Sequence, residues 1–268
     1  MRIGWIGLGA MGLGMARCSA RAGHAVVGHT RGNPAHAGLI ADGGRLERDL
    51  AATVTGCDLV CLNLFDTAQV EDVLFGQALL AGLAPGTSLV LHTTSAPHLA
   101  TGIASAAPTG VTVIDAAFSG SPQQAAEGAL TMMAGGREAD FARVAPVLAT
   151  YAVNLHHVGP LGSGMRLKLL NNLLFGAHLS LAREAFRLAA ETGISAPALA
   201  EVISGSSGAS AALAMLGRHQ PPGEISEGMQ RYLAKDIVSA TAAAMAEGLD
   251  LGLLETVASA IIGKKTEA

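Results

Sequence analysis

Short apolar runs alternate with amphipathic segments through the first 160 residues of the chain. Runs typical of buried strands occupy residues 2–7, 25–29, 58–64, 87–92, 111–116, 129–134 and 153–158. Segments with helical periodicity lie between them, at residues 10–22, 33–42, 67–75, 97–107 and 138–149. Strands that alternate with helices favour crossover connections, so the pattern predicts an α/β fold with a doubly wound parallel sheet.

The strand signal stops near residue 160, and the rest of the chain has helical periodicity. Residues 165–192 contain no proline and one glycine, Gly176, and Gly193 then provides a C-terminal capping residue. This segment predicts one long helix that is apolar on most sides and therefore buried. Further helices are expected at residues 197–204, 209–217, 226–248 and 251–262. We therefore expect two domains, 1–160 and 161–268, of which the second is all-α and is joined to the first through the long helix.

Composition narrows the class of protein. Hydrophobic residues make up 50% of the 268 residues, whereas charged residues make up 14% and aromatic residues 3%. No unbroken apolar run reaches the ~18 residues that a membrane-spanning helix needs. We therefore assign the apolar excess to strands buried on both faces and to helices buried between subunits. The net charge of −4 and the lack of a basic run argue against nucleic acid as a partner.

The cysteine positions predict no metal site. The three cysteines are Cys18, Cys57 and Cys61, and the last two lie in or beside a predicted strand, where a spacing of four does not gather ligands. Since the sequence shows no targeting segment, we expect a cytoplasmic protein with reduced thiols and no bound metal.

Glycines follow the first predicted strand at a spacing that suits a dinucleotide. The segment Gly7-Leu8-Gly9-Ala10-Met11-Gly12 fits the pattern G-x-G-x-x-G between a strand and a helix. Gly7 permits the tight turn, Gly9 lets a pyrophosphate approach the backbone, and Gly12 lets the helix lie close to the strand. The N–H groups at the start of the helix would then face the anion. The placement predicts a Rossmann domain, and a glycine-rich turn without a ligand is the alternative.

The end of the second predicted strand indicates which dinucleotide is bound. Residues 26–31 contain no Asp or Glu at the place, about 20 residues past the first glycines, where an acidic residue would bind the adenine ribose. Arg31 would attract a 2′-phosphate, and Thr30 would offer it a hydroxyl donor. We therefore expect a preference for NADP(H), with NAD use left open. The alternative is that Arg31 is a solvated loop charge.

Two further segments carry candidate catalytic and substrate-binding residues. Lys168 and Asn172 are four apart on an otherwise apolar helix and so share one face. An amine in apolar surroundings suits proton transfer to or from an alkoxide oxygen, and a lysine that merely extends its ammonium group to solvent is the alternative. Ser119-Gly120-Ser121 follows a strand at the carboxyl edge of the sheet, where hydroxyl and N–H donors would bind a carboxylate. An ordinary turn is the alternative there.

These segments together resemble the signatures of the β-hydroxyacid dehydrogenases. The matching stretches are Gly7-Leu8-Gly9-x-Met11-Gly12, Asp115 with Ser119-Gly120, Gly128-x-Leu130-Thr131-x-Met133-x-Gly135-Gly136, and Gly162-x-Gly164-x-x-x-Lys168-x-x-x-Asn172. Thr93-Thr94 with Pro97, and the pair Lys235-Asp236, are similar to two further family motifs. The family includes 3-hydroxyisobutyrate dehydrogenase, tartronate semialdehyde reductase and the glyoxylate/succinic semialdehyde reductases.

The resemblance implies a nicotinamide-dependent oxidoreductase acting on a small β-hydroxy acid or its semialdehyde. It implies a 6-phosphogluconate dehydrogenase-like helical domain through which homodimers or homotetramers form. Lys168 would be the catalytic acid/base, with Asn172 beside it. The substrate carboxylate would contact Ser119, Gly120, Ser121 and Lys235. The cofactor would contact Gly7, Leu8, Gly9, Ala10, Met11, Gly12, Thr30, Arg31, Leu64, Thr94 and Lys235.

Some positions depart from the family pattern. Ala117 replaces a usual Pro, and Ser121 and Gln124 stand where Gly is frequent. These changes lie on the expected substrate loop, and the form Ser119-Gly120-Ser121 is similar to the glyoxylate/succinic semialdehyde reductase branch. Two other functions stay open. One is an imine reductase-like NADPH enzyme, although that family usually has Asp or Tyr at the position of Lys168. The other is a non-catalytic NADP-binding regulator.

Overall fold

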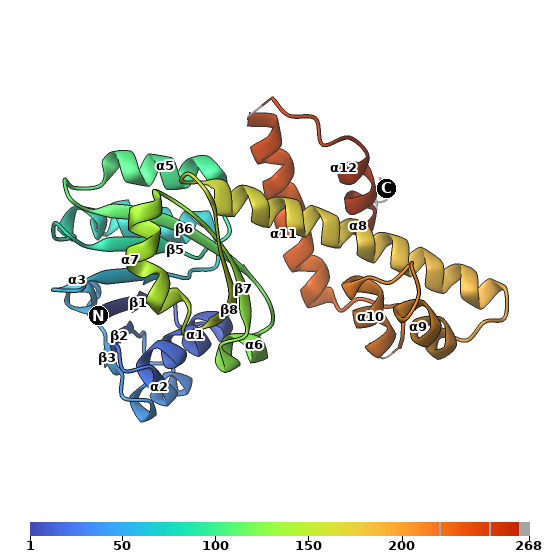
Figure 1. The fold of residues 1–268 in the computed structure, drawn as a ribbon, viewed down its shortest axis with the longest axis horizontal. Helices are drawn as coiled ribbons and strands as arrows, with labels where there is room; N and C mark the ends of the chain where they lie inside the picture. Colours follow the sequence, from blue (N-terminus) through green and yellow to red (C-terminus); the bar gives the residue numbers. More distant parts are fainter. Residues whose placement is uncertain (220, 247, 263–268) are drawn as a thin grey trace. The chain divides into compact units, whose positions relative to one another are not determined.

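The computed structural model describes residues 1–219, 221–246 and 248–262 (Figure 1). The chain divides into two compact units, Met1–Lys168 and Leu169–Ala268. All strands of the described residues belong to one sheet in the first unit, in the order β3-β2-β1-β4-β5-β6-β7-β8. Their bounds are β1 Arg2–Ile6, β2 Ala25–His29, β3 Arg45–Glu47, β4 Leu59–Leu62, β5 Ser88–Leu91, β6 Thr112–Ser119, β7 Leu130–Gly135 and β8 Ala152–Gly159.

The predicted doubly wound α/β sheet is confirmed, except that the last two strands, β7 and β8, run opposite to the other six. Every neighbouring pair is parallel except β6 and β7, which run antiparallel with Asp115 opposite Gly135. Only residues 120–129 connect these two strands. A parallel crossover needs about a dozen residues or more, so this short connection returns the chain in the opposite direction.

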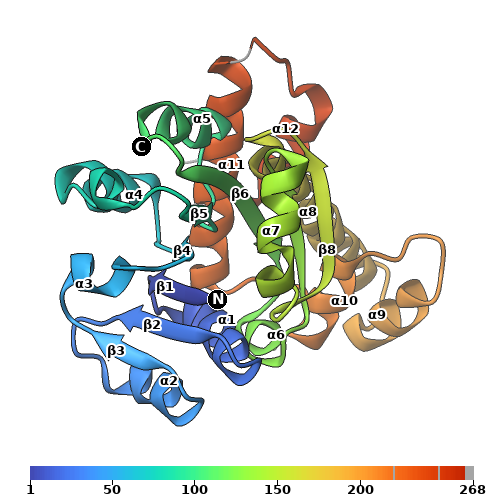
Figure 2. The same cartoon turned by 60° about the vertical axis from the view of Figure 1, so that its left-hand side comes forward.

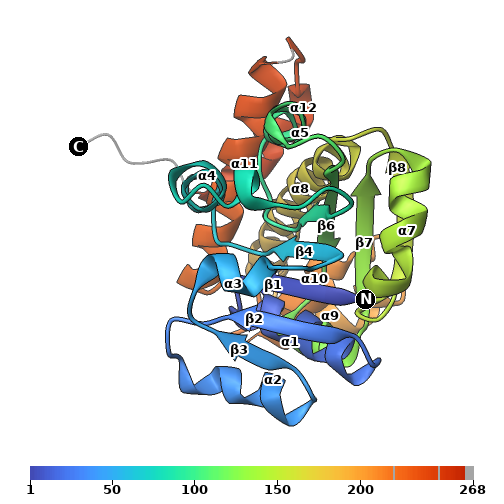
Figure 3. The same ribbon diagram turned by 90° about the vertical axis from the view of Figure 1, so that its left-hand side faces the viewer.

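Helices cover both faces of the sheet. The first unit contains α1 Ala10–Arg21, α2 Ala37–Ala41, α3 Leu50–Val54, α4 Thr67–Glu71, α5 Pro97–Ala106, α6 Pro122–Glu127 and α7 Glu138–Leu148. Three short turns complete it, η1 Pro34–His36, η2 Asp72–Gly76 and η3 Leu80–Gly82. Figures 2 and 3 show these elements from two further directions. The pattern of apolar runs did not reveal β3, α3 or α6, each of which is six residues or shorter.

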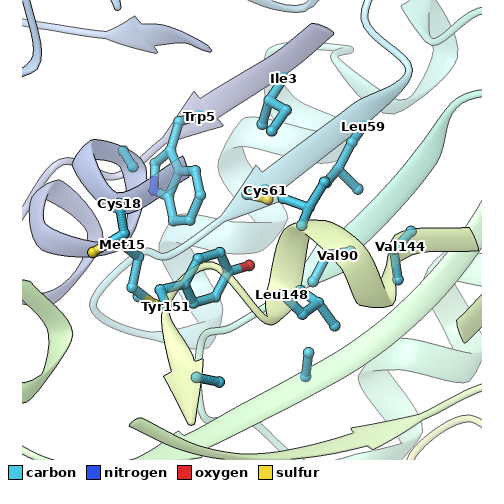
Figure 4. Close-up of a cluster of buried hydrophobic side chains, with 14 of the residues drawn as sticks. Ile3, Trp5, Met15, Cys18, Leu59, Cys61, Val90, Val144, Leu148 and Tyr151 are labelled. Carbon is cyan, nitrogen blue, oxygen red and sulfur yellow. The ribbon is translucent and has the colours of Figure 1, made fainter. Parts of the chain in front are cut away.

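Alternate residues of each central strand enter two separate hydrophobic cores. Leu59 and Cys61 of β4 pack in the core formed with α1 and α7, whereas Val60 and Leu62 pack in the core formed with α4 and α5. Figure 4 shows the first core, with Trp5 of β1 among its largest buried side chains. Because side chains alternate between the faces of a strand, a sheet that is covered on both faces needs continuous apolar runs.

The second unit is helical throughout its described residues. Helix α8 (Ser163–Glu191) starts in the first unit and continues into the second, and the predicted helix over 165–192 is therefore confirmed. The others are α9 Ala196–Ser204, α10 Ala211–Arg218, α11 Glu227–Ala246, α12 Gly252–Ser259 and the turn η4 Ala260–Ile262. Gly176 lets α8 approach α11 closely, because a Cβ there would lie 3.2 Å from Ile237 Cδ1.

Within the single chain, helix α8 is buried on one side, and its burial between subunits stays a prediction. Its inward residues Leu169, Leu173 and Leu179 belong to the core of the second unit. Its outward leucines are between 40% and 58% exposed, and they are Leu167, Leu170, Leu174, Leu181 and Leu188. Among the described residues, no helix is both long enough and apolar enough to cross a membrane.

Candidate active site

The glycine turn between β1 and α1 has the shape that an approaching anion needs. Gly7 has φ +99°, and a Cβ there would collide with the carbonyl oxygen of Asn63. A Cβ on Gly12 would collide with the carbonyl oxygen of Gly7, whereas one on Gly9 would meet no atom within 4 Å. Gly9 caps α1 without a side chain, and the first turn of α1 carries no acidic residue. The start of α1 can therefore receive a phosphate on its N–H groups.

The other residues of the glycine turn differ in the exposure of their side chains. Ala10 is exposed and Met11 is half-buried, whereas Leu8 is 6% exposed and points its side chain into the core. The two Cδ atoms of Leu8 lie where a side chain at Gly28 would be. Leu8 can thus contribute its backbone to a cofactor, and its side chain holds β2 against the turn.

A second part of the candidate cofactor site joins the ends of β4 and β5. The Leu64 N–H donates a 2.8 Å hydrogen bond to the Thr93 hydroxyl, which is 3% exposed. Thr94 follows directly and is half-buried. The arrangement places Leu64 and Thr94 at neighbouring carboxyl ends of parallel strands, where open α/β sheets bind their ligands. The sequence motif drew attention to Thr94, but Thr93 makes the bond that joins the two strand ends.

A buried histidine, His92, directly precedes Thr93 and Thr94 at the end of β5. His92 is 1% exposed, with Nδ1 2.7 Å from the Ala116 carbonyl oxygen and Nε2 3.2 Å from the Tyr151 hydroxyl. Trp5 stacks on its ring with centroids 5.8 Å apart, and Figure 4 shows Trp5 and Tyr151 in the same core. Burial lowers the pKa of His92 to about 4, so the ring is neutral near pH 7. His92 therefore has a structural role under residues 93 and 94.

The end of β2 uses Thr30 to shape its turn. Thr30 is 7% exposed, and its hydroxyl accepts a hydrogen bond from the Gly32 N–H at 3.1 Å. The same hydroxyl lies 2.7 Å from Nδ1 of His36. Arg31 between them is exposed. A phosphate at this turn would therefore meet the guanidinium of Arg31 more readily than the hydroxyl of Thr30.

The candidate substrate loop follows β6 and leads into α6. Gly120 has φ +146°, and Ser121 caps α6 through a capping box. The Gln124 N–H donates to the Ser121 hydroxyl at 3.2 Å, and the Ser121 N–H donates to the Gln124 side-chain oxygen at 2.9 Å. The two departures from the family pattern thus form one structural feature. The hydroxyl hydrogens of Ser119 and Ser121, together with the Gly120 N–H, are the donors that a carboxylate could use.

A buried carboxylate holds the start of the helix that carries Lys168. Asp115, near the middle of β6, is fully buried and accepts hydrogen bonds from the N–H groups of Gly162 at 2.6 Å and Met165 at 2.7 Å. Burial raises the pKa of Asp115, and these N–H donors oppose that shift. A Cβ on Gly135 would collide with the same carboxylate. Three separate signature segments therefore meet at Asp115, which a reading of spacing alone did not reveal.

Within the second unit, Asn172 and Lys235 both contact the carboxylate of Asp236. Asn172 of α8 is 6% exposed and donates a 2.7 Å hydrogen bond from Nδ2 to Asp236 Oδ2 on α11. Lys235 Nζ lies 3.7 Å from the other oxygen of Asp236. Lys168 precedes Asn172 by one turn on α8. The Asp236 carboxylate thus fixes the orientation of the Asn172 amide and keeps a cation next to it.

The sequence matches two protein-family profiles. Residues 2–159 match the NAD binding domain of 6-phosphogluconate dehydrogenase. Residues 162–265 match the family described as NAD-binding of NADP-dependent 3-hydroxyisobutyrate dehydrogenase. The chain belongs to the β-hydroxyacid dehydrogenase family. It is therefore an oxidoreductase with a nicotinamide cofactor.

Individual members of the β-hydroxyacid dehydrogenase family are similar along most of their length. L-threonate dehydrogenase of Escherichia coli K12 is 36% identical over 210 residues, covering 77% of this chain and 70% of that protein. The NAD-dependent L-serine dehydrogenase of Pseudomonas aeruginosa is 36% identical over 214 residues, covering 79% and 72%. The structure of Mycobacterium tuberculosis 3-hydroxyisobutyrate dehydrogenase with L-serine superposes with a TM-score of 0.84 at 28% identity, covering 97% of this chain and 92% of that one.

Proposed function

We propose that the protein transfers a hydride between NADP(H) and a small β-hydroxy acid or its semialdehyde, with Lys168 as the acid/base. The observation that supports this most is the bond between Asp115 and the start of α8. It ties the helix turn that precedes Lys168 to the strand that leads into the Ser119 loop. A regulator that only binds a cofactor would not need a lysine fixed in this way.

The cofactor, when bound, supplies or accepts the hydride. In reduction Lys168 Nζ gives a proton to the carbonyl oxygen as that oxygen becomes a hydroxyl, and in oxidation it removes the proton from the hydroxyl. Asn172, whose amide is fixed by Asp236, holds the lysine or the substrate. The turn at Gly7–Gly12 would hold the pyrophosphate, and the strand ends at Leu64 and Thr94 would contact the cofactor.

The substrate carboxylate is bound by the Ser119 and Ser121 hydroxyls and by the Gly120 N–H. Relatives named for L-threonate, L-serine and 3-hydroxyisobutyrate support a hydroxy acid as the class. Donors that are built for a charged group reject an uncharged analogue strongly, because they would be left unpaired.

NADP(H) is proposed over NAD(H) because Arg31 stands exposed at the end of β2, where no acidic residue is present. The helical residues 161–268 are proposed as the substrate and oligomerisation domain, and 1–160 as the cofactor domain. The exposed leucines of α8 support association through the helices, since Leu174, Leu181 and Leu188 recur every seven residues and leave an apolar stripe.

A substrate panel tests the proposal. We would follow NADPH absorbance with small semialdehyde acids, and NADP⁺ reduction with 3-hydroxy acids, each beside its methyl ester or amide. We expect turnover of an acid and little of its neutral analogue. Equal turnover of the neutral analogue, or turnover of a cyclic imine, would contradict the carboxylate site and favour an imine reductase. Binding of NADPH without any turnover across the panel would favour a regulator.

A further inference from the structure

A second arginine lies at the turn after β2, although it is 17 positions from Arg31 in the sequence. Strands β2 and β3 are parallel neighbours, with His29 opposite Glu47, so the loops that follow them emerge side by side (Figure 3). The Thr30 N–H donates to the Glu47 carbonyl oxygen at 2.8 Å, and His29 Nε2 lies 3.2 Å from the Arg48 carbonyl oxygen. The two loops are therefore joined by one backbone hydrogen bond and by one contact from a side chain to the backbone.

The side chain of Arg48 extends over the turn. A Cβ built at Gly32 would lie 3.5 Å from Nη2 of Arg48, and Gly32 has φ +98°. Since Gly32 follows Arg31 directly, two guanidinium-bearing residues flank the same few backbone atoms. Both arginines are exposed.

Nearby acids are occupied by backbone donors. The Glu47 carboxylate accepts hydrogen bonds from the N–H groups of Arg48 at 2.7 Å and Asp49 at 3.1 Å, and these bonds lower the pKa of Glu47. Asp49 caps α3 by accepting from the Ala52 N–H at 2.7 Å. Within the described parts of the chain, the guanidinium groups of Arg31 and Arg48 make no hydrogen bond and no ion pair. By contrast, Arg17 and Arg21 share Asp42, and Arg137 pairs with Asp140.

The Thr30 hydroxyl is already engaged within its own turn, so a second residue would have to bind the 2′-phosphate beside Arg31. The hydroxyl of Thr30 accepts from Gly32 and contacts His36, so it holds the turn that presents Arg31. A phosphate dianion is bound best by planar forks that donate two hydrogen bonds each. Arg48 supplies such a fork from the neighbouring loop.

We propose that Arg31 and Arg48 together bind the 2′-phosphate of NADP(H), and that Arg48 is a specificity-determining residue of this site. The proposal rests on the NADP(H) preference in the proposed function. A ribose without the phosphate offers only hydroxyl groups at this place, so it gains little from a second guanidinium. Arg48 therefore separates NADPH from NADH and has no part in the hydride transfer.

Calorimetric titration of the full-length protein tests the proposal without relying on turnover. The probes are NADPH, NADH and adenosine 2′,5′-bisphosphate, which keeps the 2′-phosphate and a 5′-phosphate but lacks the nicotinamide half of the cofactor. We expect Arg48→Ala to weaken NADPH and the bisphosphate by about 10- to 100-fold, the usual strength of a charge-assisted bond. NADH affinity should change by less than about twofold, since the pair makes no other contact. Arg45→Ala is the matched control, because Arg45 is an exposed arginine at the start of β3, the strand that Arg48 follows.

Two further measurements sharpen the result. Arg48→Lys should keep part of the NADPH affinity, because it keeps the charge and loses the fork. Added salt should weaken NADPH binding more in the wild type than in Arg48→Ala. If Arg48→Ala binds NADPH as tightly as Arg45→Ala does, the role of Arg48 is wrong while the NADP(H) preference stands. If the wild type binds NADH as tightly as NADPH, both the preference and the arginine pair are wrong.

Discussion

The carboxylate of Asp115 accepts a hydrogen bond from the Met165 N–H, three residues before Lys168. The two partners are 50 positions apart in the sequence. A buried carboxylate at a helix N-terminus satisfies N–H groups that the helix itself cannot pair, and it interacts favourably with the helix dipole. The position of Lys168 therefore depends on a strand residue that would contact neither substrate nor cofactor.

Replacing that carboxylate should reduce turnover while leaving cofactor binding intact. Asp115→Asn presents an NH₂ group to at least one backbone N–H, so the first turn of α8 must shift. A displacement of about 1 Å at a reacting group costs up to about 100-fold in rate, so we expect kcat to fall by 10- to 100-fold with the NADPH dissociation constant unchanged. Asp49→Asn, at the exposed N-cap of α3, is the control and should leave kcat near the wild-type value. Normal turnover in Asp115→Asn would show that the cap does not position Lys168.

Removing the amine should have the largest effect on the chemical step. Lys168→Ala should lower kcat by about 10²–10⁴, the size of a general acid/base contribution. NADPH binding, measured by titration, should stay within a few fold of the wild type. Lys168→Arg keeps a positive charge that does not deprotonate near neutral pH, so it should also remain slow in the oxidation direction. A fast Lys168→Ala variant would make the lysine structural.

Two variants of the capping box distinguish an effect on stability from an effect on substrate binding. Ser121→Ala and Gln124→Ala each break the box, and each should lower the free energy of unfolding by about 0.5–2 kcal/mol. Only Ser121→Ala also removes a hydroxyl donor from the loop, so only this variant should raise KM for the acid substrate. Denaturant unfolding and steady-state kinetics on both proteins measure the two effects. An equal rise of KM in both variants would mean that the cap, and not the Ser121 hydroxyl, supports the substrate.

The neutral state of His92 should make stability depend on pH. Its folded-state pKa is about 4, below the ordinary value of 6.5. The unfolded chain therefore binds more protons between these values, and stability should fall as the pH is lowered from about 6.5 to 4, by roughly 3 kcal/mol at most from this group. His92→Gln removes the titrating group, so its unfolding free energy should depend less steeply on pH over that interval. Identical slopes for the two proteins would exclude His92 as a source.

Long periodic segments were predictable from the sequence, and short elements were not. The helix expected over residues 165–192 spans Ser163–Glu191, because nearly thirty residues of one periodicity admit few alternatives. Strand β3 is three residues long, and its formation depends on pairing with β2. The reversal of β7 is decided by the length of the connection through α6, whose capping box was not recognised. Local pattern carries little information about such features.

The candidate site divides in the same way. The glycine turn, Lys168, Asn172 and the Ser119 loop were singled out from the sequence because their spacing is local, and their roles stay predictions. Asp115 was named only as part of a family motif, without a role, and Arg48 was not singled out. Both depend on contacts between segments that a single sequence does not connect, namely β6 with the start of α8 and the β2 loop with the β3 loop.

The position of the single tryptophan, Trp5, allows cofactor binding to be followed by intrinsic fluorescence. Trp5 lies inside the first core, and a Cβ on Gly12 would be 3.1 Å from its Nε1 atom. Its ultraviolet emission therefore originates directly beneath the turn on which the pyrophosphate would rest. Reduced nicotinamide absorbs in the range where tryptophan emits, so a bound reduced dinucleotide should accept that energy and dim the signal. Occupancy of the site can thus be followed in every variant described above without a label and without a substrate.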